Sequence, residues 1–405
     1  MTIKDLFAPT AKGLGGAIAR RAAMTLAAVM LTATTAWAQN PAVSYIDENG
    51  QTVTITDYYA LTGSETPDGN GRVVLNQDVI VVNSNVTYDQ KGLFVTSSGN
   101  EIKLILCDGK TLTINSISSD YRRVVVNKNL TIYGQTNNTG KLVVNATNKN
   151  AIEADVHTIT VNGGTVESTS TNNYGLGLLC SALVFNGGNL KLEGDVGVIC
   201  NSNSSQTVTL NWRSATDRVF IRNFDPYNNY VKTVNIGGAG GKCFTDGNGN
   251  YYGGTYTSGY SAFAGKELQP ATAYTLTLPD GVSTSTTAAF TYSGVDYYGP
   301  GSTVTLSDLP TDDPGVGYRY AYIYGGNASN GTTLTMPDAN VTVNVAIVPI
   351  DWATVNAGTE GDPYMIYNKD QLLLLAHRVN GTHGETANTY QGKYFKLGAN
   401  IAFSY

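Results

Sequence analysis

The sequence predicts an all-β protein whose main body is a right-handed parallel β-helix, a solenoid in which each repeat forms one coil. Two repeated phrases are the basis of this prediction. The phrase Asn-Gly-Gly at 162–164 returns at 186–188, 24 residues later, and the phrase Gly-x-x-Cys at 177–180 returns at 197–200, 20 residues later. Short segments of alternating apolar and polar residues flank these phrases. A strand-forming repeat of this length is typical of a solenoid.

The solenoid is expected to occupy residues 39–236, where strand patterns alternate with turns of Asn, Gly, Asp and Ser. At about 22 residues a coil it would contain about eight coils. Coils stack about 4.8 Å apart, so Cys180 and Cys200 should be neighbours, within the Cα separation of about 4.4–6.8 Å that a disulfide needs. Export would favour this bond. Both cysteines also follow apolar residues, as buried thiols do, and both alternatives stay open.

Residues 1–38 have the pattern of a secretory signal peptide. Basic residues such as Arg20 and Arg21 precede an apolar run at 22–33, and Ala-Trp-Ala at 36–38 is a small-x-small cleavage site. The apolar run of 12 residues is too short to cross a bilayer. We therefore expect export to the extracellular space or the outer cell surface, with the periplasm as the alternative, and no membrane span in the mature chain.

The composition excludes a basic nucleic-acid surface. The full chain has a net charge of −6, and without the leader's four basic and one acidic residues the charge is −9. Charged residues make up 14% of the chain, whereas about 25% is typical of soluble domains. Thr, Asn, Ser, Gly and Tyr replace them, a balance that suits strands and polar turns.

Residues 237–270 are rich in glycine and tyrosine and are expected to form a terminal hairpin over the last coil, or a linker. Within them Asp246, Asn248 and Asn250 alternate with glycine, as oxygen ligands do in calcium loops. A simple turn is the alternative for this weak calcium candidate. No cofactor is predicted elsewhere in the chain.

Residues 271–350 contain six or seven strand patterns, which is the rhythm of a small β-sandwich. One of these strands is the clearest candidate binding surface. Alternate residues of a strand share a face, and this strand places four tyrosines on one face; they are Tyr318, Tyr320, Tyr322 and Tyr324. Exposed rings would form a platform for glycans or a protein partner. The alternative is that this face is the interior of the sandwich.

Two parts of the C-terminal region resemble known families of surface proteins. The segments 298–306, 317–318 and 333–343 resemble the bacterial repeat domain of large surface proteins, which implies a spacer module. In residues 351–405, Asn368 is a plausible N-cap for a helix over 371–379 that is followed by a strand pattern from 390. This segment resembles the opening of a second β-helix in Bacteroidales-type secreted multi-domain surface or adhesin-like proteins, including those with GLUG-motif repeats. The resemblance implies a capping helix and a truncated second solenoid, and leaves open whether Tyr405 is the natural end.

These patterns favour a non-catalytic, adhesin-type protein that binds glycans or surface proteins. Two alternatives stay open: a β-helix polysaccharide lyase or glycoside hydrolase, and a purely structural stalk. An enzyme would need converging carboxylates, and the best pairs are Glu153 with Asp155 and Glu193 with Asp195. Three or more carboxylates in one groove beside Arg122 or Arg123 would favour the enzyme. The sequence predicts neither the ligand nor the oligomeric state.

Overall fold

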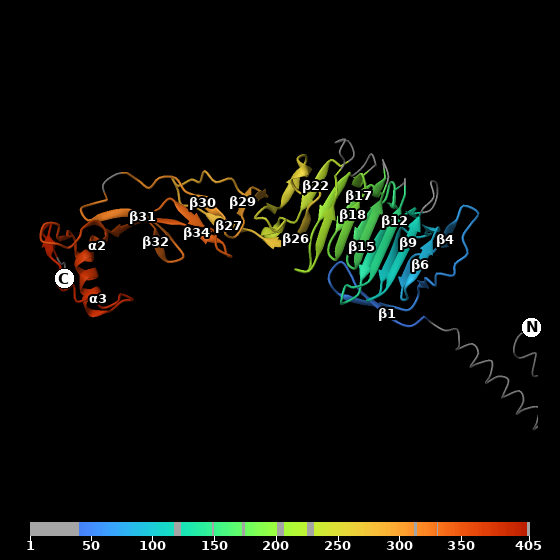
Figure 1. Ribbon diagram of the computed structural model, residues 1–405, viewed down its shortest axis with the longest axis horizontal. Helices are drawn as coiled ribbons and strands as arrows, with labels where there is room; N and C mark the ends of the chain where they lie inside the picture. The colour runs from blue at the N-terminus through green and yellow to red at the C-terminus, as the bar shows by residue number, and fades with distance from the viewer. Residues whose placement is uncertain are drawn as a thin grey trace, which may run out of the picture. The chain divides into compact units, whose positions relative to one another are not determined.

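The computed structural model describes residues 40–116, 123–147, 150–171, 175–200, 206–224, 231–311, 314–329 and 331–402 (Figure 1). The protein is nearly all β, with 46% strand and 7% helix, and contains a parallel β-solenoid of about five turns followed by further sheets and a small helix near the C-terminus. The predicted fold class is thus confirmed. The predicted signal peptide lies outside the described residues. The chain divides into two compact units, Met1–Ser181 and Ala182–Tyr405, and the boundaries of the five predicted segments stay predictions.

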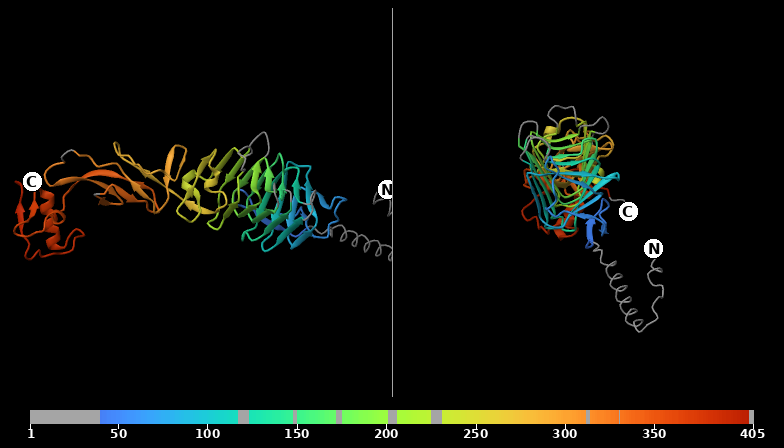
Figure 2. Two further views of the ribbon diagram at one scale, coloured as in Figure 1. Left: turned by 45° about the horizontal axis from the view of Figure 1, so that its top comes forward. Right: turned by 90° about the vertical axis from the view of Figure 1, so that its right-hand side faces the viewer.

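The first unit winds its strands into three parallel sheets, so that each coil adds one strand to each sheet (Figure 2). The first sheet contains β3 (Tyr59–Ala60), β5 (Val79–Val82), β8 (Glu101–Leu106), β11 (Asn129–Gly134) and β14 (Thr158–Val161). The second contains β6 (Val86–Asp89), β9 (Thr111–Ser116), β12 (Lys141–Ala146) and β15 (Thr165–Ser170). The third contains β4 (Arg72–Asn76), β7 (Gly92–Thr96), β10 (Val124–Val126), β13 (Ile152–Glu153) and β16 (Leu176–Cys180).

The coils are longer than the sequence repeat suggested. Val79 pairs with Lys103, 24 residues later, and Leu93 pairs with Val124, 31 residues later. The prediction of about eight coils is therefore wrong. The repeated phrases are 20 and 24 residues apart, whereas longer connections between the sheets make other coils longer than this.

Side chains in register form ladders along the second sheet. The inward ladder is apolar and at most 1% exposed, and its members are Val86, Leu112, Leu142 and Val166. The outward ladder is polar: the Asn115 amide donates to Asp89 at 2.7 Å, and the Asn145 amide donates to Asn115 at 2.9 Å. Each strand therefore contributes to the core on one face and to a chain of amide hydrogen bonds on the other.

The repeated Asn-Gly-Gly phrase forms the corner between the first and second sheets. Its last glycine has a positive φ in both copies, +76° at Gly164 and +98° at Gly188. A Cβ on Gly164 would lie 2.9 Å from Leu106 Cδ1, so both conformation and space require glycine there. The Gly188 amide donates to the buried carboxylate of Asp217 at 2.8 Å. The repeat is thus conformational: it turns the chain from one sheet to the next.

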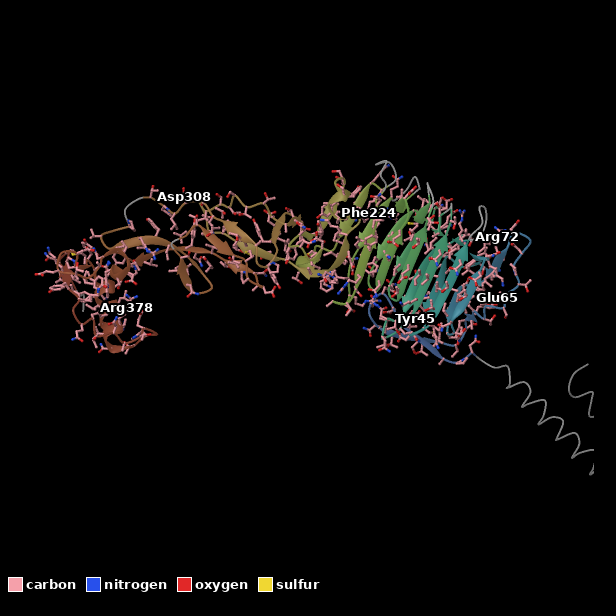
Figure 3. The ribbon with its side chains drawn as sticks, in the orientation of Figure 1. Tyr45, Glu65, Arg72, Phe224, Asp308 and Arg378 are labelled. Carbon is pink, nitrogen blue, oxygen red and sulfur yellow. The ribbon has the colours of Figure 1, made fainter. Side chains whose placement is uncertain are left out.

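A hairpin covers part of the outer face of the first sheet. It consists of β1 (Val43–Ile46) and β2 (Thr52–Ile55), which pair antiparallel. Tyr45, labelled in Figure 3, packs on Tyr133 with ring centroids 4.5 Å apart. Val81 and Ile105 belong to the same apolar cluster. The sequence analysis included these residues in the solenoid segment 39–236, and in the structure they pair antiparallel.

The second unit begins with parallel strands, and antiparallel strands pair with the last of these. Its parallel strands are β17 (Ala182–Phe185), β20 (Thr207–Leu210), β22 (Thr233–Ile236), β18 (Asn189–Glu193) and β21 (Arg218–Ile221), with β19 (Val196–Cys200) bridged to Phe224. Segment 237–270 then reverses direction through β23 (Lys242–Thr245), β24 (Tyr251–Tyr252), β25 (Gly254–Tyr256) and β26 (Glu267–Thr272). Strands β25 and β26 pair antiparallel with β22 and β21, so the parallel pairing of these two sheets ends here.

Three small sheets follow and share one core. The first contains β27 (Tyr274–Thr277), β28 (Phe290–Tyr292), β29 (Val295–Tyr298) and β34 (Val341–Thr342); the second β30 (Thr303–Thr305) and β33 (Thr333–Thr335); the third β31 (Tyr318–Tyr324), β32 (Asn327–Ser329) and β35 (Asn344–Pro349). The buried core residues are Tyr298, Val304, Leu306, Tyr322, Leu334, Met336, Val341 and Val343.

The last segment contains α2 (Trp352–Val355), β36 (Tyr364–Ile366), α3 (Lys369–Asn380) and β37 (Phe395–Leu397). The predicted N-cap is confirmed, since the side chain of Asn368 accepts from the Gln371 amide. Strands β36 and β37 pair in parallel, and Trp352 is fully buried beside them in an aromatic cluster. Within the described residues no helix has both the length and the apolarity to cross a membrane.

Candidate functional site

The tyrosine strand divides between the core and a cavity. Tyr322 is fully buried, and its hydroxyl donates to the carbonyl oxygen of Ser307 at 2.7 Å. Its predicted binding role is therefore wrong, because the ring belongs to the interior. Tyr318 and Tyr320 are half-buried, and the hydroxyl of Tyr318 donates to Asp370 at 2.9 Å. Tyr324 packs partly on the core and lines the cavity.

This cavity, which we call the β31–α2 cavity, has a volume of about 570 Å³. Its lining residues come from β31, from β32 and from the start of α2, and they are Arg319, Tyr324, Asn327, Ala328, Ser329, Asp351 and Thr354. The volume lies in the range of about 300–1,000 Å³ that is usual for small-molecule sites.

Backbone pairing and cross-element hydrogen bonds hold the walls in place. Strands β31 and β32 form a hairpin in which Tyr324 pairs with Asn327. The Gln371 amide donates to the carbonyl oxygen of Ile350 at 2.8 Å, and the Asn368 amide donates to that of Gly317 at 3.1 Å. Gly317 has φ +78°, and a Cβ there would lie 2.7 Å from the Asn368 amide nitrogen. The helix and the strand thus meet closely at a position that requires glycine.

The acidic residue that lines the cavity, Asp351, is paired with an arginine. Arg378, labelled in Figure 3, makes two hydrogen bonds to the Asp351 carboxylate, at 2.9 and 2.8 Å. A third, from Nε, reaches Glu385 at 2.9 Å. Burial acts to raise the pKa of Asp351, but the bonds from Arg378 and the Ala353 amide hold it below its ordinary value. Asp351 is therefore an ionised, structurally engaged carboxylate that also caps α2.

Arg319, the basic residue that lines the cavity, has fewer bonding partners than Asp351. Its guanidinium donates from Nη1 to the carbonyl oxygen of Tyr320 at 3.4 Å. Within the parts of the chain that the structure describes, it forms no ion pair with an acidic side chain. Burial lowers the pKa of the Arg319 guanidinium. Arginine still keeps its charge in proteins, so a positively charged side chain lines the cavity.

The cavity is lined by aromatic, amide, hydroxyl and charged side chains. Tyr324 offers an aromatic surface, Asn327 an amide, and Ser329 and Thr354 hydroxyls. None of these lining residues is a histidine or a cysteine, and the acid among them is paired. This set can stack on a ring and exchange hydrogen bonds with hydroxyl or carboxylate groups.

The weak calcium candidate forms a turn around an ion pair. Lys266 Nζ lies 2.9 Å from the Asp246 carboxylate, whose side chain is 3% exposed. The Asn250 side chain donates to the same oxygen at 2.8 Å, and the Asn248 backbone amide donates to Asp246 at 2.9 Å. Burial acts to raise the pKa of Asp246, but these bonds hold it far below its ordinary value. The Asp246 carboxylate is thus engaged by an ammonium group and by the turn itself, and the calcium site stays a prediction.

The predicted cysteine pair consists of buried thiols in this structure. Cys180 and Cys200 are both fully buried, and the thiol of Cys200 is 3.8 Å from the carbonyl oxygen of Thr207. The alternative of small buried hydrophobes fits this arrangement. The disulfide stays a prediction for the exported protein.

One acid of each predicted solenoid pair is engaged by a cation. Glu153 lies 2.8 Å from Arg123, and Glu193 lies 3.0 Å from Lys191. Arg122 lies outside the described residues. Over the described ranges no three His, Cys, Asp or Glu side chains gather as metal ligands would. The converging carboxylates that would favour an enzyme are not found in this part of the chain.

One wall of the cavity could be predicted from the sequence and the other could not. Tyr324 stood out because tyrosine recurs at every second position. Arg319 lies on the same strand, but alternation assigned it to the opposite face. Asp351 and Thr354 reach the cavity only because α2 folds back beside the hairpin, and no local pattern reports that contact. Comparison of the chain with protein-family models, curated proteins and solved structures finds no match.

Proposed function

We propose that this is an exported, adhesin-type binding protein that contacts glycans through the β31–α2 cavity without catalysing a reaction. The observation that carries the proposal is the cavity itself, in which an aromatic ring, an amide, two hydroxyls and a guanidinium share about 570 Å³. Sugars offer apolar ring faces for aromatic stacking and hydroxyls for hydrogen bonds, so this set suits them.

Two further features support binding over catalysis. Three carboxylates that a hydrolase could use as acid or base are paired with cations: Asp351 with Arg378, Glu153 with Arg123 and Glu193 with Lys191. The side chains of the solenoid strands stack in ladders. Such a stacked solenoid would be a rigid support for a binding module. The leader at 1–38 supports export.

A glycan array and mucin, probed with the exported chain from residue 39, test the proposal. We expect binding to a subset of glycans, with a loss of at least about tenfold in affinity for Tyr324→Ala and for Asn327→Ala. Tyr394→Ala is the matched control, because Tyr394 is an exposed tyrosine outside the cavity. The absence of binding together with measurable sugar release would overturn the proposal in favour of a polysaccharide-cleaving enzyme.

A further inference from the structure

We infer that the β31–α2 cavity selects acidic glycans, and that Arg319 is the residue that reads the carboxylate of a uronic acid unit. The inference rests on the proposed function, because it assigns a ligand class to the same cavity. It concerns one side chain and one functional group, so it can be tested separately from glycan binding as such.

The charge balance of the cavity favours an acidic ligand. Two charged side chains line the cavity, Arg319 and Asp351. Asp351 is bound in a two-pronged ion pair by Arg378, whose third contact is to Glu385. Arg319 has no comparable counter-charge among the described residues. A ligand that enters this cavity therefore meets a positive group without a competing free carboxylate.

A partly buried cation such as Arg319 is stabilised by a ligand that carries a negative charge. Burial disfavours the charge on Arg319, and its hydrogen bond to Tyr320 is long, at 3.4 Å. A guanidinium offers a planar fork that matches the two oxygens of a carboxylate. A bound carboxylate would supply the missing counter-charge and the missing acceptors, whereas a neutral hydroxymethyl group would supply at most one weaker acceptor.

The spacing of the lining residues favours an extended ligand. Arg319 and Tyr324 are five positions apart on β31, a span of about 16 Å at about 3.3 Å per residue. This separation of the two backbone positions leaves room for a ligand of more than one sugar ring. Tyr324 and Asn327, which pair across the hairpin, would hold one ring while Arg319 binds the acid group of another. The protein's own net charge of −6 makes this local basic site a selective feature rather than a general one.

The test uses two probes that differ only at the acid group: cellotetraose, and its oxidised form in which each C6 hydroxymethyl is a carboxylate. Isothermal titration of the exported chain should show at least about tenfold tighter binding of the oxidised form, the size expected for a hydrogen bond to a charged group. Arg319→Gln should remove this preference, so that the oxidised and the neutral probe bind with equal affinity. Arg319→Lys should retain part of it, since the charge remains while the planar fork is lost.

Arg218→Gln serves as the matched control, because this arginine lies on β21, outside the cavity. Thermal melting confirms that each variant is folded. Equal binding of both probes, or a preference that survives Arg319→Gln, would overturn the inference while leaving the proposed function intact. Binding of a glutamate-rich peptide but of no glycan would overturn both, and so would binding of neither.

Discussion

The solenoid strands and the region around β31 and α2 use polar side chains in opposite ways. In the solenoid, Asn145 donates to Asn115, which donates to Asp89, so the polar face is satisfied within the protein. In the cavity, Arg319 makes one long hydrogen bond and faces open space. The outward amide ladder is thus bonded within the protein, whereas Arg319 at the cavity has a single long hydrogen bond.

A second contrast lies between two charged groups of the second unit. Asp217 is 2% exposed and accepts from the backbone amides of Gly188, Arg213 and Ser214, at 2.8, 2.7 and 2.8 Å. It acts as a structural acceptor for chain turns. Arg319 is half-buried and holds no turn in place. Substitutions at these two positions should therefore separate stability from binding.

The greatest loss of stability is expected from the inward ladder of the first unit. Leu142→Ala should destabilise that unit by about 2–5 kcal/mol, because Leu142 is fully buried between Leu112 and Val166 and leaves a cavity when truncated. Urea unfolding followed by circular dichroism, with hydrogen exchange of β12, measures the loss. Val143→Ala on the outward face of the same strand is the control. Equal losses for both variants would show that the two faces do not differ as described.

The next largest loss of stability is expected from substitution of Asp217. Asp217→Ala leaves three backbone donors without their acceptor, and we expect a loss of about 3 kcal/mol, since each unsatisfied buried group costs roughly 1–3 kcal/mol. Asp280→Ala, at an exposed carboxylate, should change stability by less than about 0.5 kcal/mol. Chemical unfolding of both variants measures the difference. A loss at Asp217 no larger than that at Asp280 would remove the distinction between structural and available charges.

The acid stability of the last segment tests how firmly Asp351 is engaged. Its pKa lies below the ordinary value of 3.8 in the folded protein. The ion pair with Arg378 therefore contributes in full above about pH 5 and is lost as the pH falls below about 4 through the folded pKa. Because the side chains are 20% and 31% exposed, we expect about 1 kcal/mol or less.

Tryptophan fluorescence between about pH 6 and about pH 2 follows this change, because Arg378 lies 5.4 Å from the Trp352 ring. Asp351→Asn should lower the stability at the upper end of this range and flatten its dependence on pH. If the wild type and this variant lose stability in parallel on acidification, Asp351 is not the neutralised wall of the cavity.

Sequence patterns predicted the structure correctly where local chemistry decides it. The Asn-Gly-Gly corners and the Asn368 cap follow from turn and cap preferences that a few neighbouring residues fix. The predicted coil count was wrong, because loop length between sheets leaves no periodic trace. Tyr322 was wrongly assigned to a binding face, since alternation shows which residues share a face but not which face is buried.

The lining residues of the cavity also show which features local sequence patterns can and cannot predict. Tyr324 was predicted from its position on the strand, whereas Arg319, Asp351 and Thr354 gather by tertiary folding alone. Arg378, which neutralises Asp351, is 27 residues away in the chain. The electrostatic character of a site depends on such distant pairs, so the available cation could be recognised only in the folded protein.

The smallest effect is the coupling expected between two residues of the outward ladder of the solenoid. Asn115 both donates to Asp89 and accepts from Asn145, so Asn115→Ala should cost about 0.5–1.5 kcal/mol, and a double-mutant cycle with Asn145→Ala should give a coupling of about 0.5 kcal/mol. Thr113→Ala is the control, because Thr113 is on the same strand and the same outward face. A measurable coupling means that the polar side chains of the outward face bond to one another and have few donors or acceptors left for a ligand. Zero coupling means that these amides exchange freely with water, and the solenoid face would then have as much free bonding capacity as the cavity.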